Sequence, residues 1–187
     1  MAIYVTSDAH GHVRALDEAL SKISLASDDT LYVLGDMIDR GPDPVGVIKL
    51  ARSLPNAHVL KGNHEQIMLD AIIGQDPLDA ETWDINGGWT TREQLNDMEF
   101  EAYEELVRWM AGLPLYAVAE TEERPYLLVH AGIETEAARA FLLEHGVDCA
   151  DGAGATDADR ELLQQMLAVQ SSDDLLWIRH GYWDAPT

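Results

Sequence analysis

Leu31-Tyr32-Val33-Leu34-Gly35-Asp36-Met37-Ile38-Asp39-Arg40-Gly41 is the most informative stretch of this sequence. Its first four residues form a short apolar run, which predicts a buried strand. The residues that follow place two carboxylates and a guanidinium on a short loop directly after that strand. In open α/β sheets the carboxyl ends of the strands form the crevice that binds ligands. The stretch therefore predicts a strand with a functional loop at its end.

The same order of strand, polar loop and helix occurs once before this stretch and once after it. Ile3–Val5 and Ala57–Leu60 are the flanking strand-like runs, and apolar residues at helical spacing follow each loop. We expect the three helices at residues 13–23, 44–54 and 66–73. Three such units in succession predict an α/β fold around a parallel sheet with right-handed crossovers.

The chain beyond residue 73 has a different pattern. We expect residues 74–88 to be irregular, because Asn86-Gly87-Gly88-Trp89 carries a turn signal. Residues 148–159 are rich in Gly, Ala and Asp and predict a loop. We expect further helices at 100–111, 136–144 and 160–169, and strands at 115–119 and 126–129. Because neither an internal repeat nor a linker is visible, we expect residues 1–187 to form a single domain.

The composition excludes several classes of partner and site. The 187 residues include 34 acidic and 12 basic ones, which gives a formal net charge of -22. Such a surface repels nucleic acid and anionic membranes, so we expect neither as a partner. Cys149 is the only cysteine, which excludes an intrachain disulfide and a Cys-rich zinc site. With no basic leader and no apolar run long enough to cross a bilayer, the sequence predicts a cytoplasmic protein.

Metal-ligating and basic residues follow four of the predicted strands. They are Asp8 and His10, then Asp36, Asp39 and Arg40, then Asn63 and His64, and finally His130. Taken singly, such an aspartate could cap a turn and such a histidine could be a hydrogen-bonded structural residue. Four strand ends that deliver these residue types to one edge of a sheet point instead to a site.

The residue types in this set indicate which metals the site would take. Oxygen and nitrogen ligands without a thiolate suit Mn, Fe or Zn better than Ca or Mg. Two metal ions about 3.5–4 Å apart need a bridging carboxylate. Asp36 lies between the two ligand sets along the chain, so we expect it to be the bridge.

Four blocks of the sequence resemble the signature of calcineurin-like metallophosphoesterases. They are Asp8-Ala9-His10-Gly11, Gly35-Asp36-Met37-Ile38-Asp39-Arg40-Gly41, Gly62-Asn63-His64-Glu65 and Val129-His130-Ala131-Gly132. The blocks look most like those of the phosphoprotein phosphatase branch, including the small bacterial and phage Ser/Thr phosphatases. Asn86-Gly87-Gly88-Trp89 and Leu175-Leu176-Trp177-Ile178-Arg179 are similar to further pieces of that group. The resemblance implies a metallophosphoesterase β-sandwich flanked by helices.

The resemblance also implies roles for individual residues. Asp8, His10 and Asp36 would hold a first divalent metal, and Asp36, Asn63 and His130 a second, with Mn as the first choice and Fe or Zn as alternatives. A hydroxide that bridges the two metals would attack phosphorus. His64 would protonate the leaving oxygen as the general acid, and Asp39 would orient it. Arg40, Arg179 and Asn63 would bind the phosphate oxygens of the substrate.

One element of the family pattern is not found in this sequence. The family supplies a further ligand to the second metal from a Gly-His-Thr/Ser block after His130. His145 lies at a predicted helix end, and His180 precedes a glycine instead of following one. We therefore expect a domain that is C-terminally incomplete and lacks its last strands, with a weakly bound second metal and slow hydrolysis. In the alternative interpretation, His180 substitutes for the missing ligand.

The sequence is compatible with three functions. The first is hydrolysis of phosphomonoesters, with phosphoserine and phosphothreonine proteins as substrates. The second is hydrolysis of a small nucleotide substrate, as in symmetric dinucleoside tetraphosphatases, which typically lack the second Asp of Gly-Asp-x-x-Asp-Arg-Gly and read Gly-Asn-His-Asp. Asp39 and Glu65 therefore favour the phosphatase branch. The third is a non-catalytic binding relic that keeps the fold.

Overall fold

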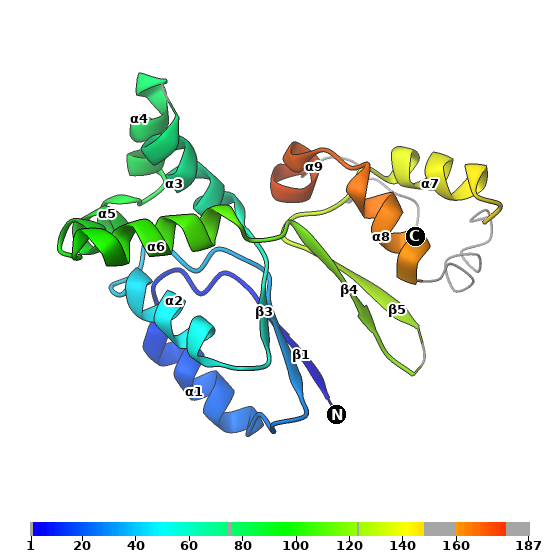
Figure 1. The fold of residues 1–187 in the computed structure, drawn as a ribbon, viewed down its shortest axis with the longest axis horizontal. Coiled ribbons are helices and arrows are strands. Elements are labelled where there is room, and N and C mark those ends of the chain that lie inside the picture. The colour runs from blue at the N-terminus through cyan, green and yellow to red at the C-terminus, as the bar shows by residue number, and fades with distance from the viewer. Residues whose placement is uncertain (1, 75, 123, 148–159, 179–187) are drawn as a thin grey trace. The chain divides into compact units, whose positions relative to one another are not determined.

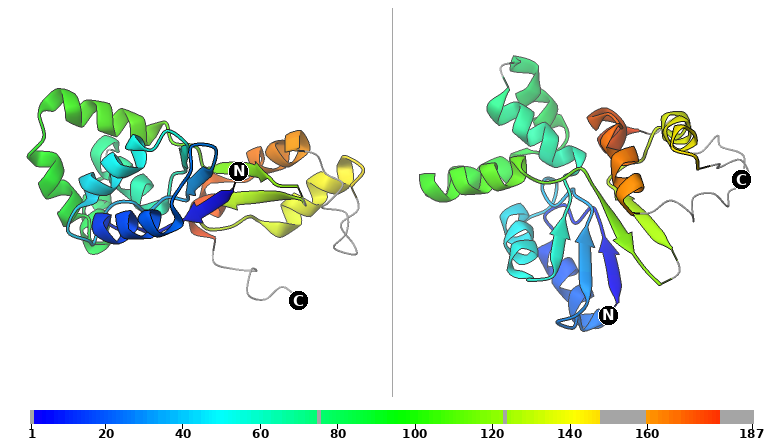
Figure 2. Two further views of the ribbon diagram at one scale, coloured as in Figure 1. Left: turned by 90° about the horizontal axis from the view of Figure 1, so that it is seen from below. Right: turned by 45° about the vertical axis from the view of Figure 1, so that its right-hand side comes forward.

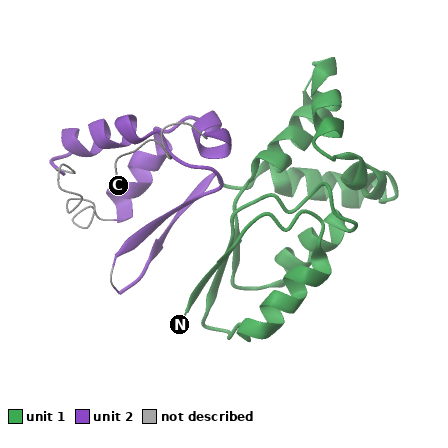
Figure 3. Ribbon diagram, turned by 180° about the vertical axis from the view of Figure 1, so that it is seen from behind, with its two compact units in different colours: residues 1–114 green, residues 115–187 purple. Residues whose placement is uncertain are grey.

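A computed structural model describes residues 2–74, 76–122, 124–147 and 160–178 of the chain. The chain divides into two compact units, residues 1–114 and residues 115–187 (Figure 3). Each unit has its own cluster of buried apolar side chains. The mixed α/β class predicted from the sequence is confirmed. The prediction of a single, C-terminally incomplete domain stays a prediction.

The first unit is built on a three-stranded parallel sheet in the order β1-β2-β3 (Figures 1 and 2). Its strands are β1 (Ile3–Thr6), β2 (Thr30–Val33) and β3 (Ala57–Val59). Its helices are α1 (Val13–Ile23), α2 (Pro44–Ser53), α3 (Asn63–Ile73), α4 (Pro77–Ile85), α5 (Trp89–Asn96) and α6 (Phe100–Ala111). The three predicted β-loop-α units are confirmed, and their strands are neighbours in sequence order.

Local sequence explains where α2 begins. The carboxylate of Asp43 accepts a hydrogen bond from the backbone N–H of Gly46 at 2.9 Å. An aspartate at this position satisfies one of the unpaired N–H groups at a helix start. Pro44 follows as the first helical residue, where its missing N–H costs little. The helix therefore starts directly after the loop that carries Asp36 to Arg40.

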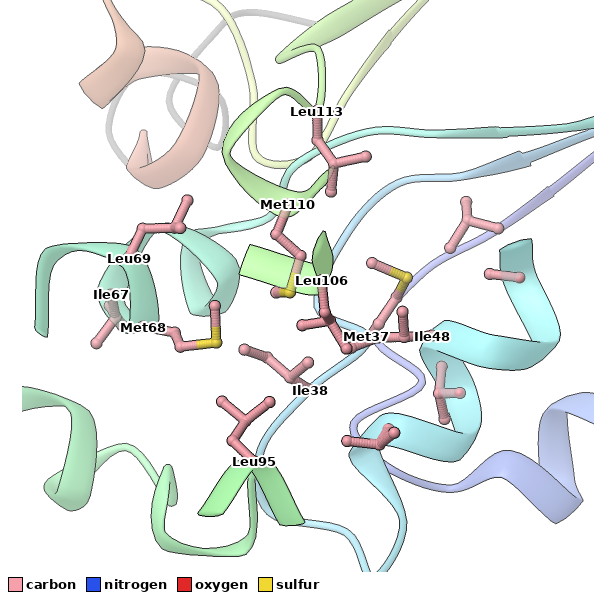
Figure 4. Packing of buried hydrophobic residues seen from close by; sticks show 14 of the residues in the cluster. Met37, Ile38, Ile48, Ile67, Met68, Leu69, Leu95, Leu106, Met110 and Leu113 are labelled. Carbon is pink, nitrogen blue, oxygen red and sulfur yellow. The ribbon is translucent and has the colours of Figure 1, made fainter. Parts of the chain in front are cut away.

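The core of the first unit includes two residues of that loop. Met37 and Ile38 are fully buried among side chains of α2, α3 and α6, including Ile48, Met68 and Met110 (Figure 4). Burial of such a side chain contributes about 1.5–3 kcal/mol. The apolar residues at the middle of the loop therefore anchor the polar residues on either side of them.

The expectation that residues 74–88 are irregular is wrong. Residues 77–85 form α4, whose start is capped by Asp76, because its carboxylate accepts the N–H of Leu78 at 2.9 Å. Pro77 again takes the first helical position. Trp83 on this helix is 3% exposed and belongs to the core. The Asn86-Gly87-Gly88-Trp89 turn does occur, but it forms only the short connection between α4 and α5.

The second unit contains a β-hairpin and three described helices. Strands β4 (Tyr116–Glu120) and β5 (Pro125–Val129) pair antiparallel. The helices are α7 (Thr135–Glu144), α8 (Arg160–Ala168) and α9 (Ser172–Trp177). Its core contains Val118, Leu142, Leu167 and Leu175.

One topological expectation is corrected by the second unit. We expected the strand before His130 to end at the same sheet edge as the three N-terminal strands. Within the described residues that strand, β5, pairs with β4 in a two-stranded sheet of its own. The error has a simple cause, since one apolar run at strand length carries no information about the sheet it joins.

Two further observations complete the fold. None of the described helices combines the length and the apolar character that crossing a membrane requires. The loop predicted at 148–159 and the residues Arg179 and His180 lie outside the described residues.

Candidate active site

The loops after β1 and β2 adopt an unusual backbone conformation. Five polar residues on them have positive φ angles, namely Asp8 (55°), His10 (39°), Asp36 (53°), Asp39 (68°) and Arg40 (65°). Residues other than glycine rarely occupy this left-handed region, and each such residue costs of order 1–3 kcal/mol. Strained residues of this kind cluster at functional sites. The strain falls on five residues to which the sequence assigned a chemical role.

Glu65 holds two of the loops together. It is fully buried on the first turn of α3, and its carboxylate accepts the backbone N–H groups of Asp36, Met37 and Gly62, each at 2.8 Å. Burial raises the pKa of Glu65, and the nearby Asp36 carboxylate raises it further, while the three N–H groups act in the opposite direction. The loop after β2 and the start of α3 are thereby fixed to one side chain.

Glycines allow these loops to approach closely. A Cβ at Gly35, whose φ is +87°, would lie 2.2 Å from the backbone nitrogen of Gly62. A Cβ at Gly62 would lie 2.2 Å from Oδ1 of Asp36. Only glycine fits where two backbones or a backbone and a carboxylate come this near. The glycines of the sequence blocks therefore set the distance between the loops.

His10, Asp36 and His64 bring candidate ligand atoms together. Nε2 of His10 lies 3.6 Å from Oδ2 of Asp36, and Nε2 of His64 lies 3.9 Å from the same oxygen. One ligand atom from each residue falls within 4.8 Å of the other two. All three residues are buried, with exposed fractions of 8%, 3% and 1%.

Hydrogen bonds fix the tautomers of both imidazoles. Nδ1 of His10 lies 2.8 Å from the backbone oxygen of Ile38, and Nδ1 of His64 lies 2.7 Å from Oδ2 of Asp39. Both partners are acceptors, so Nδ1 carries the proton in each ring and Nε2 has the lone pair. Arg40 donates to these lone pairs, from Nη1 to His10 at 2.9 Å and from Nη2 to His64 at 2.7 Å. A positive group therefore already lies against the two Nε2 atoms.

Electrostatics keep His10 in the neutral form that a ligand needs. Burial lowers the pKa of His10 most, and the nearby Arg40 and His64 lower it as well. The backbone oxygen of Ile38 and the Asp36 carboxylate act in the opposite direction, and the net shift is downward. Neutral imidazole with its second nitrogen bound to a backbone carbonyl is the usual state of a metal-ligating histidine.

The donor set fits a divalent metal ion. Asp36 supplies a carboxylate, His10 and His64 supply ring nitrogens with lone pairs, and Asp8 adds an oxygen 3.8 Å from Nε2 of His10. A mixed set of this kind suits first-row metals such as Mn, Fe and Zn. The set includes His64, which we predicted as a proton donor and not as a ligand.

Asp39 and His64 form a hydrogen-bonded pair beside the candidate metal ligands. The Asp39 carboxylate is fully buried and also accepts hydrogen bonds from Nε1 of Trp83 at 3.0 Å and from Oγ1 of Thr91 at 2.6 Å. A carboxylate bound to Nδ1 holds an imidazole in one tautomer and orientation, as in catalytic triads. The arrangement can orient Nε2 of His64 for proton transfer.

The remaining predicted site residues lie as follows. Asp8 is exposed, and Asn63 is buried at the first position of α3. His130 follows β5 in the second unit and is half-buried. The first unit thus brings together Asp8, His10, Asp36, Asp39, Arg40, Asn63 and His64. Their assignment as ligands, acid or phosphate binders stays a prediction, as it does for His130 and Arg179.

Sequence reasoning missed three residues that support the site. Glu65 was used only to distinguish the phosphatase branch from the tetraphosphatases and was given no structural role, and Trp83 and Thr91 were not singled out. The signal for Trp83 and Thr91 was the Asn86-Gly87-Gly88-Trp89 turn, which lies between them in the sequence. Backbone N–H of Arg40 donates to the oxygen of Gly87 at 3.1 Å, so this turn touches the loop that carries Arg40.

Comparison with known families gives an independent indication of what the chain resembles. The family described as Calcineurin-like phosphoesterase matches residues 1–184. A symmetrical bis(5'-nucleosyl)-tetraphosphatase of Proteus mirabilis is 33% identical over 138 residues, which cover 71% of this chain and 45% of that protein. The enzyme of the same name from Erwinia tasmaniensis is 30% identical over 136 residues, with the same shares covered. The chain therefore spans less than half the length of these relatives.

A solved structure gives an independent comparison of the fold. The protein serine/threonine phosphatase of Saccharomyces cerevisiae with similarity to human phosphatase PP5 matches with a TM-score of 0.56. The match covers 95% of this chain and 51% of that chain at 18% identity. At this identity the comparison supports the fold and not a shared substrate.

Proposed function

Because the chain belongs to the calcineurin-like phosphoesterase family, we propose that it is a metal-dependent hydrolase of phosphoesters, with bis(5'-nucleosyl) tetraphosphates as its first candidate substrates. The observation that carries the proposal is the buried cluster of His10, Asp36 and His64 with Arg40 against it. The candidate substrates come from the relatives in Proteus mirabilis and Erwinia tasmaniensis, whose names state this activity.

We assign the metal ligands as follows. Asp8, His10 and Asp36 would hold one divalent ion, and Asp36 and Asn63 would contribute ligands to a second. Bound ions of this kind polarise phosphoryl oxygens and lower the pKa of water. The buried Asp36 carboxylate suits a bridge, because its Oδ1 accepts the backbone N–H of His64 at 3.0 Å while its Oδ2 faces the Nε2 atoms of His10 and His64.

Arg40 would bind the phosphate under attack. Its guanidinium donates through two nitrogens in one plane, and this geometry matches two oxygens of a phosphate. In a chain with a net charge of -22, such a placed cation is needed to offset repulsion of an anionic substrate.

His64 would protonate the leaving oxygen. Nδ1 is committed to Asp39 at 2.7 Å, so His64 would act in its doubly protonated form, and the proton on Nε2 would pass to the leaving oxygen. General acids of this type contribute typically 10²–10⁴-fold to rate. Asp39 stabilises the charged imidazole and keeps its orientation.

The Asp39–His64 pair also favours a second candidate, the hydrolysis of phosphoserine or phosphothreonine in proteins. A serine or threonine alkoxide is a much poorer leaving group than a phosphate, and so its departure depends more on a proton donor. A proton donor held by a fully buried carboxylate is the feature that such substrates demand. The two candidates share the metal site and differ in the leaving group.

One assay tests the proposal and separates the candidates. The purified chain with Mn²⁺ is incubated with diadenosine tetraphosphate, a phosphoserine peptide and p-nitrophenyl phosphate, and products are quantified by ³¹P NMR. We expect hydrolysis that a chelator abolishes and that Asp36→Asn lacks, with the highest kcat/KM on diadenosine tetraphosphate. The highest value on the phosphopeptide would establish the second candidate. Equal rates for the wild type and Asp36→Asn on all three substrates would refute both.

A further inference from the structure

The buried carboxylate of Asp39 has more partners than the single imidazole it orients. Its Oδ2 accepts from Nδ1 of His64 at 2.7 Å. Its Oδ1 accepts from Oγ1 of Thr91 at 2.6 Å, and Nε1 of Trp83 lies 3.0 Å from Oδ1 and 3.2 Å from Oδ2. Side chains from three different helices therefore converge on one carboxylate.

Thr91 binds Asp39 in two ways. Its Oγ1 donates to the carboxylate and accepts the backbone N–H of Asp39 at 2.9 Å. The residue so held has a φ of 68°, a conformation that costs energy and persists only where neighbours enforce it. Thr91 therefore fixes both the backbone and the side chain of Asp39.

Trp83 fixes the plane of the same carboxylate. Its indole N–H lies between the two oxygens, while the ring is 3% exposed and packs in the core of the first unit. The space beside the ring is closed, because a Cβ at Gly88 would lie 2.2 Å from Cδ1 of Trp83. The indole cannot shift toward that turn without moving the backbone.

We propose that Trp83 and Thr91 are positioning residues, which act through Asp39 to aim His64 at the leaving group. The inference rests on the proposed function of His64 as a proton donor. Without the donors on Oδ1, the carboxylate could rotate about its Cβ–Cγ bond and the direction of its bond to Nδ1 would no longer be fixed. The helices α4 and α5 thus supply the support of the acid.

If Trp83 and Thr91 had a purely structural role, their replacement would affect activity in a different way. Buried polar groups need partners in any case, and losing one costs about 1–3 kcal/mol of stability. Such a loss would slow all substrates alike. A loss of proton donation slows a substrate with a poor leaving group and leaves one with a good leaving group less affected.

The test compares Thr91→Val and Trp83→Phe with wild type on phenyl phosphate and p-nitrophenyl phosphate. Valine keeps the shape of threonine, and phenylalanine keeps an aromatic ring without the N–H donor. We expect kcat on phenyl phosphate to fall about 10-fold or more, a size typical of losing a supporting partner, with KM unchanged. On p-nitrophenyl phosphate we expect kcat to change less than threefold. Thr91→Ser, which keeps the hydroxyl, restores the wild-type ratio.

Thr90→Val is the matched control. Thr90 is a buried neighbour on the same helix, and its Oγ1 donates to the oxygen of Gly87 at 3.3 Å. We expect it to leave the ratio of the two kcat values unchanged. The inference is overturned if Thr91→Val and Trp83→Phe slow both substrates equally, or if Thr90→Val changes the ratio as Thr91→Val does.

A second readout separates this inference from the proposed function. In a ¹H–¹⁵N spectrum the indole N–H of Trp83 is assigned by its loss in Trp83→Phe. We expect Thr91→Val to shift the Nδ1–H resonance of His64 and the Trp83 indole resonance, whether or not any substrate is hydrolysed. Wild type without phosphatase activity would refute the proposed function alone. Both resonances unmoved in Thr91→Val would refute the positioning role.

Discussion

Asp36 takes part in contacts through three of its atoms at once. Its backbone N–H donates to Glu65, its Oδ1 accepts from the backbone of His64, and its Oδ2 faces the imidazoles of His10 and His64. The first two contacts fix the carboxylate in place, with Oδ2 turned toward the two imidazoles. Because the carboxylate is already ordered, it loses little conformational entropy when it binds a metal.

Glu65 offers a prediction at the scale of one residue. Glu65→Gln leaves one acceptor oxygen for three backbone N–H groups and places an amide N–H against at least one of them. We expect the free energy of unfolding to fall by about 2 kcal/mol, from an unsatisfied buried donor. Urea unfolding measures this change. Glu104→Gln, on the exposed face of α6, is the control and should stay near wild type. Equal urea midpoints for both variants would contradict the role of Glu65.

Single residues also show what sequence can and cannot predict about the site. Asp8, His10, Asp36, Asn63 and His64 were identifiable because they follow strands at regular positions. Glu65, Trp83 and Thr91 were not, because hydrogen bonds to a carboxylate or to backbone groups 28 or more positions away leave no periodic signal. Partners of this kind become visible only when the loops are placed in space.

At the scale of elements, glycines determine how closely the loops after β2 and β3 approach. Gly35 and Gly146 have similar φ angles, +87° and +83°, but different surroundings. A Cβ at Gly35 meets backbone at 2.2 Å, and one at Gly146 meets nothing within 4 Å. A comparison of the two glycines therefore separates the effect of crowding by neighbouring backbone from the effect of a left-handed backbone conformation.

We predict that Gly35→Ala is far more damaging than Gly146→Ala. The alanine at 146 bears only the cost of a left-handed backbone, about 1–2 kcal/mol. The alanine at 35 must also displace the backbone at Gly62, which we expect to abolish metal binding and lower the melting temperature strongly. Thermal unfolding by circular dichroism and Mn²⁺ titration of both variants check this. Similar losses in the two variants would mean that crowding is unimportant.

Asp29 connects the start of β1 to the turn before β2. Its carboxylate accepts the N–H of Ala2 at 2.6 Å and that of Ala26 at 3.0 Å. The hydrogen bond from Ala2, and then that from Ala26, hold the pKa of Asp29 below its ordinary value. The stabilisation is complete above the unfolded pKa of about 3.9 and is lost as pH falls through the folded pKa.

Asp29→Asn should therefore flatten the acid limb of the stability profile. Urea midpoints measured at several pH values from 7 to about 2 should fall more steeply below about pH 4 in the wild type than in Asp29→Asn. Asp17→Asn, an exposed control on α1, should follow the wild type. An acid limb as steep in Asp29→Asn as in the wild type would contradict the assignment.

At the scale of the whole molecule, the chain has two units with separate cores. The sequence predicted the parallel sheet because each of its strands is followed by a polar loop and a helix. It did not predict the division after residue 114, because apolar spacing alone does not state which elements share a core. It also assigned His130 to the wrong sheet for the same reason.

The separate cores predict local effects of core mutations. Leu167 is fully buried in the second unit, so Leu167→Ala removes side-chain packing there at a cost of about 2–5 kcal/mol. We expect hydrogen exchange to accelerate in β4 and β5 and to stay unchanged in β1 to β3. Met110→Ala, in the core of the first unit, should show the reverse pattern. If either substitution accelerated hydrogen exchange equally in both sheets, the two units would unfold together as a single cooperative unit, and the prediction would be wrong.

The most direct test of a metal centre at His10 and Asp36 is a calorimetric titration of the chain with Mn²⁺. Asparagine at position 36 keeps an oxygen for the N–H of His64 but loses the charge that faces the imidazoles. We predict that Asp36→Asn lowers Mn²⁺ affinity at least about 100-fold with an unchanged circular dichroism spectrum. His12→Asn, an exposed neighbour of the site, should bind Mn²⁺ like the wild type. Mn²⁺ binding by Asp36→Asn at wild-type affinity would contradict the metal centre.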